Sequence, residues 1–220
     1  MYRETQFFRY VYSRRKAFGD LNRADNRRRL VTEYLGSLRI RRPGIDVAGL
    51  ESRLLGAANS YRSFLASILE DLAKSQGKPR CGEKTPQHAI FAETLCEWFP
   101  GAAIIHLVRD PREVVASLQR VPWASNSVVT NARIWVRYNL AARQSRHRPE
   151  YLMVCYQDLV VRPEQELLRI CTHLNEQYSP SMLIPAEERV AYRSWSQQSN
   201  SSIMGIERNG SYVPVCAVRA

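Results

Sequence analysis

The stretch Ala102-Ala-Ile-Ile-His-Leu-Val-Arg-Asp-Pro-Arg-Glu-Val-Val-Ala-Ser117 decides the fold of this 220-residue chain. Its first half is an apolar run of the kind that forms a strand buried on both faces, as in a parallel sheet. A helix should follow at once, because Asp110 can cap it, Pro111 suits its first turn and Glu113 can complete a capping box. The stretch therefore predicts a strand that leads directly into a helix.

Arg109 stands at the junction between this predicted strand and the helix. A helix N-terminus at the carboxyl end of a parallel strand attracts anions, because its free N–H groups and its dipole favour negative charge. Ser117, two turns further on, can add a hydroxyl donor. The pattern favours a phosphate pocket, and a surface ion pair at an ordinary helix start is the alternative.

A second element lies upstream, where Cys81-Gly-Glu-Lys-Thr-Pro86 precedes a predicted helix over residues 87–98. Thr85 is a good N-cap residue, and the proline after it suits the first helical position. The helix start would present Lys84 at a strand end, at the sheet edge that also carries Arg109 if the two strands run parallel. A solvated lysine paired with the preceding glutamate is the alternative.

A third element repeats the plan, with the apolar stretch Tyr151-Leu-Met-Val-Cys-Tyr156 and a later helix that should end at Leu174. In this order and spacing, the three elements resemble sulfotransferases that use 3′-phosphoadenosine-5′-phosphosulfate (PAPS). The chain is most similar to the broad bacterial sulfotransferase group, with kinship to the tyrosyl-protein sulfotransferases. The resemblance covers residues 80–174.

The resemblance implies a role for five residues of this chain. Arg109 and Ser117 match the arginine and serine that bind the 3′-phosphate of PAPS in that family. Lys84 matches a strand-end lysine beside the transferred sulfuryl group, and so is a candidate catalytic residue. Tyr156 matches a tyrosine next to the nucleotide. Arg120 stands one position away from a family arginine that contacts phosphate, and we include it among the candidate nucleotide-binding residues.

The N-terminal segment departs from the family pattern. Intact members begin with a strand, a Gly/Ser/Thr-rich loop around the 5′-phosphosulfate and a helix, whereas this chain has no such loop and no Gly-x-x-x-x-Gly-Lys motif. Its opening resembles the segment after that helix, so that Glu4 matches the catalytic base of the tyrosyl-protein enzymes. A frayed terminal glutamate is the alternative. We therefore expect an N-terminally truncated fold with impaired activity and a tendency to self-associate.

The resemblance implies a helix-rich α/β protein with the three-layer, P-loop-NTPase-like sulfotransferase fold and a mainly parallel sheet. We expect a single domain over residues 1–220, because a chain of this length with 45% hydrophobic residues can form one core. Its expected regions are a mostly helical insert, a nucleotide-binding core and a C-terminal loop region, over residues 1–78, 79–174 and 175–220. Apolar residues at helical spacing predict helices over residues 21–38, 47–74 and 127–146.

The net charge of +11 is compatible with several partners. Summed positive potential attracts an anionic nucleotide or an acidic acceptor, and a solvated helical face would explain the same charge. The sequence has no zinc-finger, RNA-recognition or helix-turn-helix signature, so nucleic acid is not the expected partner. Two alternatives to a sulfotransferase are kept: a degenerate, non-catalytic nucleotide-binding or interaction module, and a basic nucleic-acid-binding helical protein.

Five cysteines without Cys-x-x-Cys spacing favour reduced packing thiols and a cytoplasmic location. No apolar run approaches the ~18 residues of a membrane-spanning helix, and the N-terminus has no signal-peptide core. The chain offers no metal-ligand cluster. We predict PAPS as co-substrate, no metal, and a hydroxyl-bearing acceptor, with glycan, lipid, small molecule and peptide all open.

Overall fold

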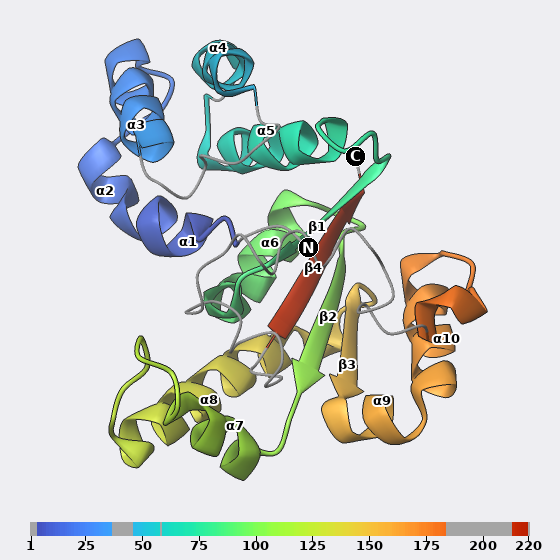
Figure 1. Ribbon diagram of the computed structural model, residues 1–220. Coiled ribbons are helices and arrows are strands. Elements are labelled where there is room, and N and C mark those ends of the chain that lie inside the picture. The colour runs from blue at the N-terminus through green and yellow to red at the C-terminus, as the bar shows by residue number, and fades with distance from the viewer. Residues whose placement is uncertain (1–3, 37–45, 58, 184–212, 220) are drawn as a thin grey trace. The chain divides into compact units, whose positions relative to one another are not determined.

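The computed structural model of the chain describes residues 4–36, 46–57, 59–183 and 213–219 (Figure 1). The chain divides into two units, Met1–Ala102 with Val215–Ala220, and Ala103–Pro214. Each unit combines helices with a pair of strands, which confirms the predicted helix-rich α/β class. The expected single domain with its three regions stays a prediction.

The first unit is mostly helical. Its helices and strands, in chain order, are α1 Phe7–Tyr10, η1 Tyr12–Arg14, α2 Arg15–Phe18, α3 Ala24–Gly36, α4 Val47–Ala57, α5 Tyr61–Lys74, β1 Arg80–Lys84, η2 Pro86–Phe91, α6 Ala92–Trp98 and β4 Val213–Arg219. Helices α3, α4 and α5 lie side by side (Figure 1). Strand β1 pairs antiparallel with β4, so that Lys84 stands opposite Val215.

Two predicted helices of this unit have different bounds from those expected. The helix predicted over residues 47–74 is divided into α4 and α5, because the Ser60 hydroxyl accepts from the backbone N–H of Ser63 and starts a new helix. The helix predicted over residues 21–38 is α3, which begins at Ala24. In both cases periodicity located the helix, and for α5 the Ser60 cap sets its start.

Aromatic rings form the core beneath the start of the chain. Phe7 and Phe8 of α1 are fully buried, and the Phe8 ring stacks on Phe91 with 4.4 Å between centroids. Trp98 of α6 packs against both phenylalanines. Aromatic pairs bury large areas, so this cluster attaches the N-terminal segment firmly to η2 and α6.

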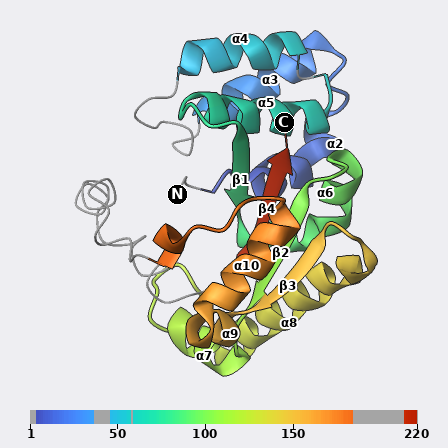
Figure 2. The ribbon, with the colours of Figure 1, turned by 90° about the vertical axis from the view of Figure 1, so that its right-hand side faces the viewer.

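The second unit contains the predicted strand–helix pairs. Its elements are β2 Ala103–Val108, α7 Pro111–Leu118, α8 Val128–Gln144, η3 Ser145–His147, β3 Tyr151–Cys155, α9 Tyr156–Val161, α10 Pro163–Leu174 and η4 Pro180–Leu183. Strands β2 and β3 pair in parallel, with Ile104 opposite Tyr151. Within this unit α7 and α8 lie on one side of the two strands and α10 on the other (Figures 1 and 2). The predicted parallel strands with helices on both faces are therefore confirmed.

A buried polar network connects β2 with β3 and α8. His106 on β2 is 2% exposed, and its Nε2 donates to Oδ1 of Asn139 at 2.9 Å. The hydroxyl of Tyr151 donates to its Nδ1 at 2.5 Å. Burial is the main cause that lowers the pKa of His106 to about 4, so the ring is neutral near pH 7.

Four cysteines with placed side chains, Cys81, Cys96, Cys155 and Cys171, are free thiols. Cys96 and Cys171 are buried among apolar residues, which confirms their role in packing. Burial raises the pKa of Cys81 to about 11, so this thiol is a poor nucleophile.

Candidate active site

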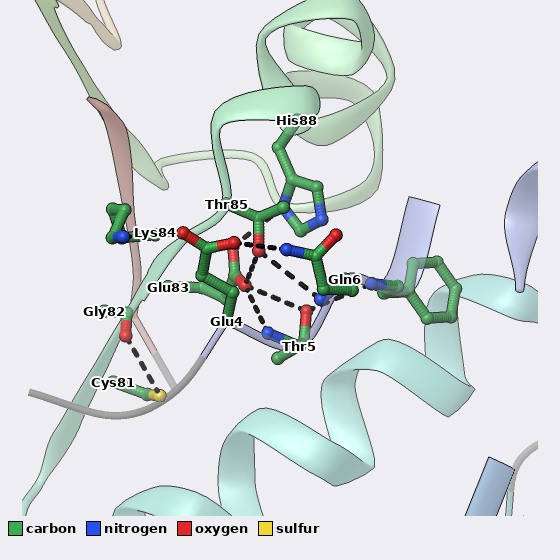
Figure 3. Close-up of polar contacts among 10 residues, drawn as sticks. Glu4, Thr5, Gln6, Cys81, Gly82, Glu83, Lys84, Thr85 and His88 are labelled. Atoms are coloured by element: carbon green, nitrogen blue, oxygen red, sulfur yellow. Dashed lines mark hydrogen bonds and ion pairs between the residues drawn. The ribbon is translucent and has the colours of Figure 1, made fainter. Parts of the chain in front are cut away.

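Glu4 and Lys84, the two predicted catalytic residues, are in direct contact. Lys84 is the last residue of β1, and its Nζ lies 2.6 Å from Oε1 of Glu4 (Figure 3). The Lys84 side chain is 9% exposed and the Glu4 side chain is 21% exposed. The Gln6 side-chain amide donates to Oε2, the other oxygen of the same carboxylate. The alternative of a frayed terminal glutamate is therefore wrong.

Glu83, the neighbour of Lys84, points to a different set of partners. Successive side chains of a strand alternate between its faces, so Glu83 cannot share the surroundings of Lys84. Its Oε1 accepts from the backbone N–H and the hydroxyl of Thr5, both at 2.9 Å. Its Oε2 lies 2.7 Å from Nδ1 of His88. The alternative that Lys84 is merely paired with Glu83 is therefore wrong.

The ionised form of Glu83 is strongly favoured in spite of its burial. Burial alone would raise the pKa, but the charge and hydrogen bond of His88 and the hydrogen bonds from Thr85 and Thr5 lower the pKa to about 2. This carboxylate is 7% exposed. Sequence reasoning placed Glu83 beside Lys84 at the strand end but gave it no role, because its partners Thr5 and His88 carry no motif.

Thr85 stands at the predicted N-cap position, with Pro86 as the first residue of η2, but its side chain makes no capping bond. Its hydroxyl oxygen accepts from the backbone N–H of Gln6, and its hydroxyl donates to Oε1 of Glu83 at 2.5 Å. The chain continues as the 3₁₀ helix η2 and becomes α-helical only at α6, so residues 87–98 do not form one continuous α-helix. Stretches of 3₁₀ helix are frequent at the ends of α-helices.

The strand–helix turn at Arg109 is confirmed in its main features. Asp110 accepts from the backbone N–H of Arg112 at 2.8 Å, and Pro111 is the first residue of α7. Hydrogen bonds from the side chain and backbone of Arg112 lower the pKa of Asp110 to about 2. The expected capping box is wrong, since the Glu113 carboxylate accepts from Nε of Arg109 at 2.7 Å.

Arg109 and Tyr156, both predicted to bind the nucleotide, are also in contact. The guanidinium of Arg109 lies over the Tyr156 ring, 4.8 Å from its centroid. Trp135 Nε1 donates to the backbone carbonyl of Arg109 at 3.2 Å and so fixes the end of the strand. Trp135 is half-buried and supports this turn.

Ser117 lies in the last turn of α7, and Arg120 lies in the turn just after it. Residues at i and i+4 share a helix face, so Glu113 and Ser117 lie along one side of α7. Ser117 is 3% exposed, and its carbonyl accepts from the backbone N–H of Arg120 at 3.1 Å. Arg120 is exposed. The nucleotide-binding roles of these two residues stay predictions.

Within the described parts of the chain there is no group of three or more His, Cys, Asp or Glu side chains that could hold a metal ion. A search of the same residues finds no helix that is both long and apolar enough to cross a membrane. The positive groups just described are side chains and a helix N-terminus, which can bind an anion directly.

Comparison with known proteins agrees with this arrangement. A sequence model of the sulfotransferase family matches residues 2–180. This match covers most of the chain and includes both groups of candidate site residues. The chain therefore belongs to the sulfotransferase family.

The individual relatives share at most about a third of their residues with this chain over the matched region. Two nematode proteins, from Caenorhabditis briggsae and Caenorhabditis elegans, are each 32% identical over 126 residues and carry the name "Putative protein-tyrosine sulfotransferase". The matched region is 54% of this chain and 45% and 49% of the two relatives, so the chain spans about half the length of the curated relatives it matches. A sulfotransferase domain from the curacin biosynthetic pathway is 20% identical with a TM-score of 0.48, over 78% of this chain and 62% of that one.

Proposed function

We propose that this chain transfers a sulfuryl group from PAPS to a hydroxyl group of an acceptor. The observation that carries the proposal is the contact between Lys84 and Glu4, with 2.6 Å between Nζ and Oε1. These are the residues that the family resemblance assigns to the chemistry, and they come from positions 80 residues apart in the sequence. A carboxylate can accept the proton that the acceptor hydroxyl loses, and a cation beside it can stabilise the negative charge on the leaving oxygen.

The reaction needs one group to accept a proton and another to stabilise negative charge. The acceptor oxygen forms a bond to sulfur while the bond between sulfur and the 5′-phosphate oxygen breaks, and adenosine 3′,5′-bisphosphate (PAP) leaves. The ionised Glu4 carboxylate can take the proton from the acceptor hydroxyl as general base. The Lys84 ammonium can stabilise the charge that develops on the leaving oxygen.

The second group of residues is proposed to bind the nucleotide. Arg109 can form charge-assisted hydrogen bonds with the 3′-phosphate, and the positive end of the α7 dipole favours the same anion. Tyr156 stacks on the Arg109 guanidinium and keeps it oriented. Ser117 and Arg120 are proposed as further phosphate contacts. No step of this reaction requires a metal.

The identity of the acceptor follows less directly. The two nematode relatives are named for protein tyrosine, so a tyrosine-containing peptide is the first acceptor to test. Glycans, lipids and small alcohols follow as further classes. The proposed cytoplasmic location rests on the cysteine pattern alone.

The test is an assay of sulfuryl transfer from labelled PAPS to these acceptor classes. Glu4→Gln removes the base with little change of shape, and loss of a general base costs roughly 10²–10⁴-fold in turnover. Lys84→Met keeps most of the stem without the charge, and we expect a loss of about 10²-fold or more with only modest weakening of PAP binding. Lys74→Met on the exposed face of α5 is the matched control. Turnover unchanged by both site variants would refute the proposal, and PAP binding without any turnover would favour a non-catalytic module.

A further inference from the structure

We propose that Glu83 is a positioning residue, whose buried carboxylate holds the segment with Glu4 against the strand end with Lys84. The inference rests on the proposed function, in which Glu4 and Lys84 are the reacting pair. It assigns a role in catalysis to a side chain that reaches neither substrate.

Glu83 fixes the backbone next to Glu4. Its Oε1 accepts from both the backbone N–H and the hydroxyl of Thr5 at 2.9 Å. Thr5 is itself 5% exposed, so these bonds cannot be exchanged for bonds to water at low cost. Because Thr5 stands between Glu4 and Gln6, holding Thr5 limits the movement of both neighbours.

A chain of hydrogen bonds continues from Glu83 to the reacting pair (Figure 3). The Thr85 hydroxyl donates to Glu83 and accepts from the backbone N–H of Gln6 at 3.4 Å. The Gln6 side chain donates to Glu4, which pairs with Lys84. Lys84 leads back along β1 to Glu83, so the contacts form a closed ring.

Backbone strain at Gln6 is a second, independent sign that this segment is held in place. Its φ of 53° lies in the left-handed region, which is unusual for a residue other than glycine. Such a conformation is unfavourable for a residue with a side chain and persists only where surrounding contacts determine it. The bonds through Thr5 and Thr85 supply those contacts.

His88 makes the burial of the Glu83 charge possible. Its ring is 4% exposed, packs edge-on against Phe8 at 4.8 Å and presents Nδ1 to Oε2 at 2.7 Å. A buried carboxylate without such a partner would be strongly destabilising. The aromatic core is thereby connected with the hydrogen bonds that orient Glu4.

The geometry also explains why Glu83 is not the reacting base. Three donors converge on Oε1, and Oε2 faces His88 in the interior. Because the residue is only 7% exposed, an acceptor hydroxyl has no access to this carboxylate. The depressed pKa of Glu83 agrees with this assignment, because a weak base takes up a proton reluctantly.

The first test measures Lys84 directly and does not depend on activity. Trace acetylation of the full chain with acetic anhydride, followed by mass spectrometry of peptides, gives the reactivity of Lys84 relative to exposed Lys74. In Glu83→Leu the ring is broken, and we expect this ratio to rise about threefold or more. Glu83→Gln keeps the acceptor oxygen for Thr5 and Thr85, so its ratio should stay within about twofold of the native chain.

Because Glu83→Leu could fail to fold, milder variants accompany it. Thr85→Val keeps the shape of the side chain and removes both bonds of its hydroxyl, and its ratio should rise about twofold. Thr172→Val, at a threonine of α10 whose hydroxyl donates to the Leu168 carbonyl, is the matched control and should leave the ratio unchanged. An unchanged ratio in folded Glu83→Leu or Thr85→Val would overturn the inference.

Turnover provides the second test. We expect Glu83→Leu to lower kcat by 10-fold to 100-fold with little change in KM for PAPS, and Glu83→Gln to restore most of it. If Glu83→Gln lost as much as Glu83→Leu, Glu83 would be a reacting group and the inference would be wrong. A native chain without turnover would refute the proposed function, whereas the acetylation ratio would still decide the positioning role.

Discussion

Arg109→Ala is the substitution that tests nucleotide recognition most directly. The Arg109 side chain is 19% exposed, and its present partners are the Glu113 carboxylate at 2.7 Å and the Tyr156 ring at 4.8 Å. We propose that the guanidinium binds the 3′-phosphate of PAPS and of PAP. Adenosine 5′-monophosphate (AMP) lacks this phosphate, so the variant should lower affinity for PAP and leave affinity for AMP nearly unchanged.

The size of the effect follows from the contacts that Arg109 exchanges. A hydrogen bond between charged groups contributes about 1.5–3 kcal/mol. Binding the phosphate gives up the ion pair with Glu113, which is worth only about 0.3–0.5 kcal/mol because the carboxylate is 50% exposed. The net loss of roughly 1–2.5 kcal/mol corresponds to a 5-fold to 60-fold weaker affinity for PAP.

Isothermal titration calorimetry with PAP and AMP measures this difference. Arg112→Ala is the matched control, because it removes the same charge from an 89% exposed side chain on the same helix. We expect the control to keep the preference for PAP. Equal affinity of the native chain for PAP and AMP, or an equal loss for both nucleotides in Arg109→Ala, would refute the assignment of Arg109 to the 3′-phosphate.

Two further predictions concern Glu113 and His106. Glu113→Gln frees the Arg109 guanidinium from a competing carboxylate, so affinity for PAP should rise about twofold to threefold; weaker binding by calorimetry would contradict this. The pKa of His106 is about 4 in the folded chain, whereas an unperturbed histidine in the unfolded chain takes up a proton below about pH 6.5. The free energy of unfolding should therefore fall by about 3 kcal/mol as the pH falls from 6.5 to 4. Urea unfolding at a series of pH values measures this loss, and His106→Gln should largely remove it. If the stability of the variant fell with pH as steeply as that of the native chain, the loss could not be due to His106.

The strand–helix turn at Arg109 could be predicted because its causes are local. An apolar run forms β2, and the short sequence after it contains the cap and the proline of α7. The contact between Arg109 and Tyr156 follows from the parallel pairing of β2 and β3, because the carboxyl ends of parallel strands lie at one edge. Local signals and one rule of topology were sufficient here.

The predicted capping bonds of Thr85 and Glu113 are absent because each side chain has other hydrogen-bond partners in the folded chain. Thr85 stands at the cap position, but its hydroxyl oxygen accepts from the backbone N–H of Gln6 instead, and its proton goes to the buried Glu83 carboxylate. Glu113 could have completed a capping box, yet the Arg109 guanidinium offers it a charged partner. A sequence shows which donors and acceptors exist, and only the folded arrangement decides which of them meet.

The buried network around Glu83 lies beyond what sequence patterns can indicate. Thr5 and Glu83 are 78 residues apart and share no motif, and His88 belongs to no motif either. Family resemblance identified Glu4 and Lys84 as candidates, but not the contacts that keep them together. Such contacts depend on how α1, β1 and η2 pack, which no short stretch encodes.

The two groups of candidate residues differ in a way that suits their proposed tasks. Arg109 is paired with an exposed carboxylate, so an incoming phosphate can replace Glu113 at little cost and the nucleotide product can leave again. Lys84 and Glu4 rest on bonds among Glu83, Thr5 and Thr85, which are all buried and cannot exchange with water. A sulfuryl transfer gains most of its rate from correct placement of the reacting groups. Rigid support is therefore needed under the reacting pair, and a replaceable partner is needed where the nucleotide binds and departs.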